Sequence, residues 1–188
     1  MAKKLSGITR QNVTTIIKCK IGVDMKTILT CLTLLIAVSA IAQNETPEKE
    51  LTDYIVEWSK AAPNKTNRAL SYIPHVLSAA EKYSIDHMLI AVIISQESSW
   101  DKNAVGQIGE IGLMQVHGRC AVGCELTSVA GQIDCGVRCL SRWVSECNSG
   151  HDMERALNGY ATGRCYPIAQ VTKRRMSAWR KAVIGGKQ

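Results

Sequence analysis

The chain has 188 residues, of which 46% are hydrophobic and 5% aromatic, with eight cysteines and a formal net charge of +7. This length is enough for one globular domain of ordinary size plus a processed leader, and it is too short for two full domains. No pattern typical of nucleic-acid binding accompanies the positive charge, so we expect no nucleic-acid partner.

The first 42 residues predict a leader with a signal peptide. Lys26 precedes the apolar run ILTCLTLLIAV, and Ala40-Ile41-Ala42 has the small-x-small form that signal peptidase prefers. The run is shorter than the ~20 residues of a membrane-spanning helix, so we expect no stable membrane anchor after cleavage; a retained anchor is the alternative. Residues 1–24 fit neither a signal peptide nor a fold, so we expect translation to begin at Met25.

Removal of the leader changes the meaning of both the charge and the cysteines. The leader holds six basic residues and one acidic residue, so the remaining chain carries only +2. An even number of cysteines in an exported chain predicts disulfides, and the sequence does not choose among the 15 pairings that six cysteines allow. A zinc site formed by the two Cys-x-x-x-Cys pairs is the alternative, but we expect neither a metal nor a cofactor. The six that remain are Cys120, Cys124, Cys135, Cys139, Cys147 and Cys165.

The rest of the chain predicts an all-α fold. Residues 43–69 are expected to form an N-terminal helical and linker segment, in which the helical pattern ends before Pro63, and residues 70–188 a catalytic domain with a basic tail. Asp86 has the position of an N-cap for a helix that ends near Glu97. The glycine-rich segment 101–118 predicts a short irregular hairpin. Further helices are expected within 73–86, 132–147, 152–161 and 168–183.

Seven basic residues near the C-terminus have no acidic residue among them. Such a run is typical of a solvated helix face and tail, and the alternative is attraction to an anionic polymer or membrane surface. They are Arg164, Lys173, Arg174, Arg175, Arg180, Lys181 and Lys187.

Glu97 follows the apolar run MLIAVII and lies close to Trp100. The C-terminal end of a helix carries a partial negative charge, and apolar neighbours withdraw a carboxylate from water, so both effects raise its pKa. A glutamate that stays protonated near neutral pH can donate a proton to a leaving oxygen, as the acid of a glycosidase must. The alternative is a glutamate that points into solvent.

The segment IISQESSWDKNAVGQIGEIGLMQVHG resembles the signature of the soluble lytic transglycosylases, which are goose-type-lysozyme-like enzymes with a lysozyme-like fold. In that family a helix ends in Glu-Ser and a Gly-Leu-Met-Gln segment follows. IDHMLIAVIISQES upstream and ALNGYATG downstream resemble the family's entry into the catalytic helix and its Ala-Leu-x-x-Tyr-Asn-x-Gly segment. The resemblance covers about residues 70–165.

The resemblance implies a secreted or periplasmic enzyme that acts on peptidoglycan glycan strands. Glu97 would protonate the glycosidic oxygen between N-acetylmuramic acid and N-acetylglucosamine, and would then remove a proton from the muramyl C6 hydroxyl to give a 1,6-anhydro product. Ser98 would help to position Glu97. Met114 and Gln115 would line the cleft, and Tyr160 would form a hydrogen bond near the catalytic carboxylate. The alternatives are a core side chain for Met114 and a buried tyrosine with a satisfied hydroxyl for Tyr160.

The sequence also departs from the family pattern. Ala161 stands where the family usually has asparagine, Gly106 where it often has serine, and Cys139 where a tyrosine is expected. The first two changes remove side chains that could hold the acetamido group of the sugar. Two other functions therefore stay open, namely a hydrolytic lysozyme in which Asp101 or Glu110 positions a water, and a peptidoglycan-binding protein that has lost activity.

Overall fold

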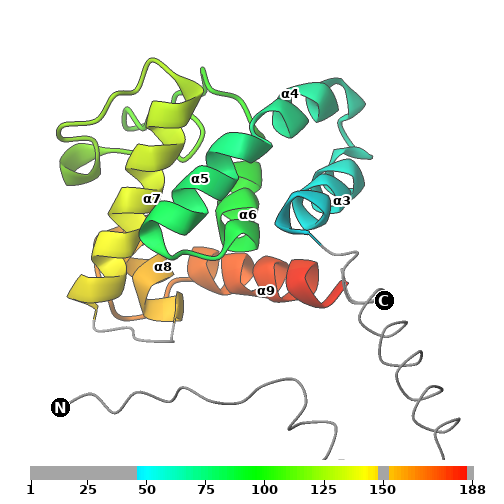
Figure 1. Cartoon of the computed structure of the whole chain (residues 1–188). Helices are drawn as coiled ribbons and strands as arrows, with labels where there is room; N and C mark the ends of the chain where they lie inside the picture. The colour runs from blue at the N-terminus through cyan, green and yellow to red at the C-terminus, as the bar shows by residue number, and fades with distance from the viewer. Residues whose placement is uncertain (1–45, 148–152, 186–188) are drawn as a thin grey trace, which may run out of the picture. The chain divides into compact units, whose positions relative to one another are not determined.

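The structure is a computed structural model that describes residues 46–147 and 153–185, all of them within one compact unit, Thr46–Gln188 (Figure 1). The predicted leader, its cleavage site and the start at Met25 lie outside the described residues. Among the described residues, no helix combines the length and the apolar character needed to cross a membrane.

The described chain is helical, as predicted, and its longer helices fall close to the expected ranges. In chain order they are α3 (Pro47–Ser59), α4 (Thr66–Ser71), α5 (Ile73–Tyr83), α6 (His87–Glu97), α7 (Val129–Glu146), α8 (Met153–Thr162) and α9 (Gln170–Gly185). Two short 3-10 turns, η1 (Pro63–Lys65) and η2 (Gly118–Cys120), complete them. The sequence analysis did not predict α4, η1 or η2, because elements of three to six residues carry too little periodicity to detect.

Helix α6 is the centre of the fold and is packed on several sides by α3, α5 and α9. The carboxylate of Asp86 caps its first turn by accepting a hydrogen bond from the Leu89 amide at 2.9 Å, as predicted. The eight consecutive residues 88–95 are all buried. A helix that is buried on every side needs an apolar run in place of an amphipathic stripe.

The remaining helices pack against one another and against α6. Helices α7 and α8 pack against each other, α5 packs on α7, and α9 packs against both α6 and α8 (Figure 1). The loop of residues 101–117 forms two isolated antiparallel bridges, Val105 with Ile111 and Ile111 with Val116, which agrees with the expected irregular hairpin.

Three disulfides join the six cysteines of the described unit. They pair Cys120 with Cys139, Cys124 with Cys135, and Cys147 with Cys165. The first two attach the segment after the hairpin to α7, and the third attaches the end of α7 to the segment after α8. The prediction of disulfides is confirmed, and the pairing shows that they support the half of the domain that contains α7 and α8.

Candidate active site

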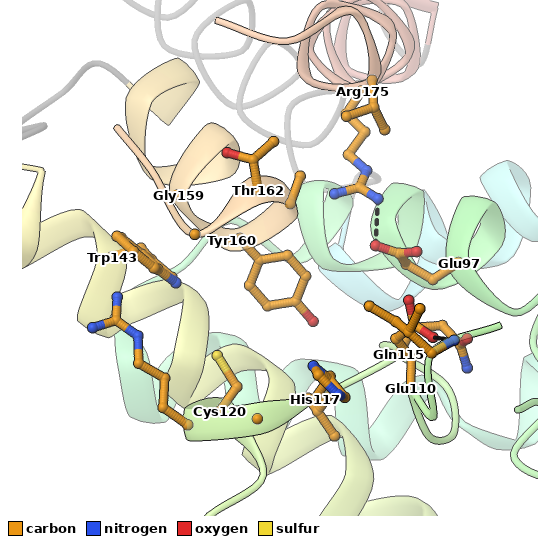
Figure 2. Close-up of a pocket in the computed structure, with 17 residues that line it drawn as sticks. Glu97, Glu110, Gln115, His117, Cys120, Trp143, Gly159, Tyr160, Thr162 and Arg175 are labelled. Atoms are coloured by element: carbon orange, nitrogen blue, oxygen red, sulfur yellow. Dashed lines mark hydrogen bonds and ion pairs between the residues drawn. The ribbon is translucent and has the colours of Figure 1, made fainter. Parts of the chain in front are cut away.

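A cleft of about 430 Å³ opens beside the C-terminal end of α6. Its walls come mainly from the end of α6, the loop 106–120, the end of α8 and one face of α9. Figure 2 shows the polar side chains that meet there, among them Glu97, Gln115 and Tyr160. The fold thus brings three of the five predicted site residues to one cavity.

Glu97 is the last residue of α6 and is the point where that helix leaves the core. Its side chain keeps only 18% of its exposure. Burial raises the pKa of Glu97 above its ordinary value; the positive charge of Arg175 opposes this rise, and the negative charge of Glu110 adds to it. The carboxyl therefore stays protonated to a higher pH than an exposed glutamate, which is the state that a general acid needs.

The chain turns sharply directly after Glu97. Ser99 and Trp100 adopt left-handed backbone angles, with φ of 52° and 63°. Such angles cost non-glycine residues about 1–3 kcal/mol each and persist only where the surroundings hold them. The Trp100 ring is fully buried, and its indole nitrogen donates to the Ser95 hydroxyl at 2.9 Å. Burial of Trp100 therefore holds the turn that ends the helix at Glu97.

The hydroxyl of Ser98 links this turn to the loop opposite. It lies 2.9 Å from the Leu113 carbonyl oxygen and 3.2 Å from the Ile94 carbonyl oxygen, either of which can accept a hydrogen bond from it. Ser98 does not line the cleft. It can affect chemistry only by fixing the end of α6, and this geometry is compatible with the positioning role that we expect for it.

Gln115 lies on the cleft side of the loop, in a left-handed backbone conformation with φ of 47°. Its side-chain amide donates to the Gly112 carbonyl at 2.8 Å and to the Ala104 carbonyl at 3.2 Å. Both of its amide hydrogens therefore have acceptors within the loop, and the side-chain oxygen is the group left to accept a hydrogen bond from a ligand.

Met114 lies under the cleft and not along it, contrary to the expectation from the sequence. Its side chain is fully buried. A Cβ atom at Gly136 of α7 would stand 2.5 Å from both Cβ and Sδ of Met114, so the missing side chain of Gly136 makes room for the methionine. Met114 therefore joins the loop to the core, and only its neighbour Gln115 faces the cleft.

Tyr160 projects from α8 into the middle of the cleft (Figure 2). Its hydroxyl donates to the Met114 carbonyl oxygen at 2.5 Å and not to Glu97. Burial raises the pKa of Tyr160, with the charge of Glu97 as the second cause. The neutral tyrosine therefore joins α8 to the loop, and it lies close enough to Glu97 for the charge of that carboxylate to affect its pKa.

Glu110 is the second carboxylate of the cleft. Its Oε2 accepts a hydrogen bond from the Ile108 amide at 3.0 Å, and bonds from the backbone amides of Glu110 and Ile108 lower its pKa. A Cβ atom at Gly106 would stand 2.2 Å from the same oxygen. Glu110 thus fills the space that a serine side chain at position 106 would take. Asp101 instead accepts a bond from the Asn103 amide and lies outside the cleft lining.

Arg175 of α9 is a site residue that sequence reasoning missed. It was expected to belong to a solvated basic face, yet its side chain keeps only 6% of its exposure and forms an ion pair with Glu97 (Figure 2). The available signal was its place in α9, because Thr172 lies three residues before it and Trp179 four residues after it, and both side chains belong to the packed face of the helix. In the part of the chain that the structure describes, no cluster of three or more metal-ligating side chains forms.

The model of the transglycosylase SLT domain family matches residues 75–182, which include every wall of this cleft. The chain belongs to the transglycosylase SLT domain family. The resemblance deduced from the sequence is therefore confirmed.

Curated proteins are similar in sequence to the chain over shorter stretches than the family model. The chain is 38% identical over 73 residues to membrane-bound lytic murein transglycosylase C of Pectobacterium atrosepticum, which covers 37% of this chain and 20% of the relative. The protein of the same name from Haemophilus influenzae is 45% identical over 49 residues, 26% of this chain and 14% of the relative. That from Actinobacillus succinogenes is 35% identical over 80 residues, 40% of this chain and 22% of the relative.

The chain thus spans about a fifth or less of the length of these curated relatives. Their names describe them as membrane-bound, so they lend no support to the expected absence of a membrane anchor. No solved structure is a significant match to the chain.

Proposed function

We propose that this protein is an exported peptidoglycan lytic transglycosylase of the cell envelope. It would cleave the β-1,4 bond between N-acetylmuramic acid and N-acetylglucosamine and form a 1,6-anhydromuramic end. The single observation that carries the proposal is Glu97, a half-buried carboxyl with a raised pKa at the end of an apolar helix, inside the cleft of an SLT domain.

The chemistry needs one carboxyl group that changes its protonation state twice. Protonated Glu97 donates its proton to the glycosidic oxygen as the bond from that oxygen to C1 of the muramyl sugar breaks, so the leaving sugar departs as a neutral alcohol. The carboxylate of Glu97 then accepts the proton of the muramyl C6 hydroxyl as that oxygen bonds to C1. The sugar supplies its own nucleophile, and Glu97 returns to its starting state.

The remaining cleft residues fit a supporting part in this reaction. The side-chain oxygen of Gln115 is positioned to accept a hydrogen bond from a sugar hydroxyl or amide, because the loop holds its amide hydrogens. Tyr160 joins α8 to the loop at Met114, and Ser98, which lies outside the cleft, joins the end of α6 to the same loop at Leu113. Ala161 lines the same cleft and offers no polar group, so recognition of the acetamido group would depend more heavily on Gln115.

The test is the variant Glu97→Gln, assayed by the clearing of a suspension of purified peptidoglycan. Glutamine keeps the shape of the side chain and cannot serve as the acid, so we expect turnover to fall by at least about 100-fold, within the contribution typical of a general acid. The matched control is Glu81→Gln, the same change at an exposed position of α5 outside the cleft. Wall clearing by Glu97→Gln at the wild-type rate would remove Glu97 from the mechanism and refute the proposal.

Glu110 supports a second candidate function, a hydrolytic lysozyme. Its pKa is lowered while that of Glu97 is raised, and the two carboxylates line one cleft. Environments that separate two pKa values in this way are typical of an acid and base pair, in which the ionised member activates a water. The two candidates differ in the product, because hydrolysis leaves a reducing muramic end. Glu110→Gln would abolish hydrolysis and would leave anhydro-product formation intact.

A further inference from the structure

Arg175 contacts the carboxyl group on which the proposed reaction depends. It lies on the face of α9 that packs against α6, and its Nη2 donates to Oε1 of Glu97 in an ion pair whose side chains keep only 6% and 18% of their exposure. An arginine in a solvated helix face gains little from such a pair, whereas a buried pair forms only where the packing brings both charges together.

The pair is made through a single contact. Arginine usually binds a carboxylate through two parallel hydrogen bonds. Here only Oε1 of Glu97 is held, and among the described residues none donates to its Oε2. Within the same described part of the chain, Nε and Nη1 of Arg175 are buried without an acceptor. The arrangement therefore fixes one oxygen of Glu97 and leaves the other available to a substrate.

Helix α9 is attached to its surroundings on both sides of Arg175. At its start, the fully buried Asn158 of α8 accepts hydrogen bonds from the Ala169 amide at 2.7 Å and from the Thr172 hydroxyl at 2.9 Å. Further along, the Trp179 indole donates to the carboxylate of Asp86 at 2.9 Å. Because Asp86 also caps α6, the helix that carries Glu97 and the helix that carries Arg175 are tied to each other.

We propose that Arg175 is a positioning residue for Glu97, which holds Oε1 so that Oε2 faces the glycosidic oxygen, and which stabilises the carboxylate formed once the proton has left. The inference rests on the proposed function of Glu97. In the first step the proton moves from Glu97 to the leaving oxygen, and the guanidinium balances the new negative charge. In the second step the carboxylate takes the proton of the C6 hydroxyl, and the pair returns to its starting charge.

The charges around Glu97 allow this assignment to be tested by titration. Arg175 from α9 faces it, Glu110 from the loop interacts with it and itself interacts with His117, and Tyr160 from α8 lies close by. Burial raises the pKa of Glu97 and Arg175 moderates the rise. Loss of the guanidinium must therefore raise the pKa of Glu97 further, by about 1–3 pH units for an opposite charge at contact distance.

The experiment compares Arg175→Met, Arg175→Lys and the control Arg174→Met, which removes the exposed neighbouring arginine. The pKa of Glu97 is measured by carbon NMR of its carboxyl group, assigned with Glu97→Gln, and the rate of wall digestion is measured as a function of pH. Thermal melting shows that each variant is folded at the assay pH.

We expect Arg175→Met to raise the pKa of Glu97 and to move the basic limb of the rate profile upward by the same amount, about 1–3 pH units. The rate at its optimum should fall about 10- to 100-fold, the usual value of one hydrogen bond to a charged group made in the transition state. Arg175→Lys should keep the position of the limb, and Arg174→Met should match wild type.

A folded Arg175→Met variant with an unchanged pKa of Glu97, or with an unchanged rate profile, would overturn the inference while leaving the proposed function in place, provided that Glu97→Gln is inactive. If Glu97→Gln digests wall like wild type, the proposed function fails, and the assignment of Arg175 fails with it for that separate reason.

Discussion

Replacement of Tyr160 with phenylalanine separates a structural part for this tyrosine from a catalytic one. The change deletes one hydroxyl and little volume. In the structure that hydroxyl donates to the Met114 carbonyl oxygen at 2.5 Å, and this bond joins α8 to the loop that carries Gln115. The hydroxyl therefore contacts the loop and not Glu97.

The expected magnitude follows from the acceptor that is left behind. Met114 is fully buried, so its carbonyl oxygen loses a partner that water cannot easily replace, at a cost of about 1–3 kcal/mol. A domain of this size loses about 2–4 °C of melting temperature per kcal/mol, which predicts a fall of roughly 2–12 °C. The rate of digestion should fall less than tenfold, because the loop keeps its other attachments at Ser98 and Gln115.

The assay pairs differential scanning fluorimetry with initial rates on purified peptidoglycan. Tyr166→Phe serves as the matched control, since Tyr166 is 52% exposed and loses the same atom at the surface. An unchanged melting temperature together with a rate loss of about 100-fold would show that the hydroxyl acts on the substrate or on Glu97. That result would refute the structural role of the hydrogen bond between Tyr160 and the Met114 carbonyl oxygen.

Two further predictions concern the support of the cleft. Reduction of the three disulfides should lower the melting temperature clearly, since each contributes about 2–4 kcal/mol to the free energy of unfolding. Thiol titration of the unfolded, unreduced domain should find almost none of its six cysteines free, and six titratable thiols would contradict the pairing. Gly136→Ala should lower both the melting temperature and the rate, because its new Cβ would meet Met114 at 2.5 Å, and the overpacking cost of about 1–3 kcal/mol exceeds the helix-propensity gain of ~1 kcal/mol. A melting temperature above wild type would show that Met114 can move aside freely.

Patterns within a single segment predicted much of this fold. The N-cap at Asp86, the apolar helix after it and the placement of Glu97 at its end all follow from residues close together in the sequence. Local hydrogen bonds and hydrophobic periodicity fix such features, and the sequence displays both. The even number of cysteines likewise predicted disulfides, although their pairing depends on how α7 approaches the loop.

Features that depend on packing between distant segments could not be predicted. Met114 faces the core because Gly136, on another helix, leaves a space that only the folded contact reveals. Arg175 looked like one more member of a basic run, because charge along the chain does not show which side of α9 meets α6. The acceptor of the Tyr160 hydroxyl was likewise set by the approach of α8 to the loop.

The most direct test of the central claim is mass spectrometry of the fragments released from purified peptidoglycan by the wild-type protein, with Glu97→Gln as the blank. If the half-buried Glu97 acts as both acid and base, the fragments will end in 1,6-anhydromuramic acid, which is lighter by one water than a reducing muramic end. Fragments that carry only reducing ends would contradict the account and would assign the cleft, with Glu110 as the base, to hydrolysis.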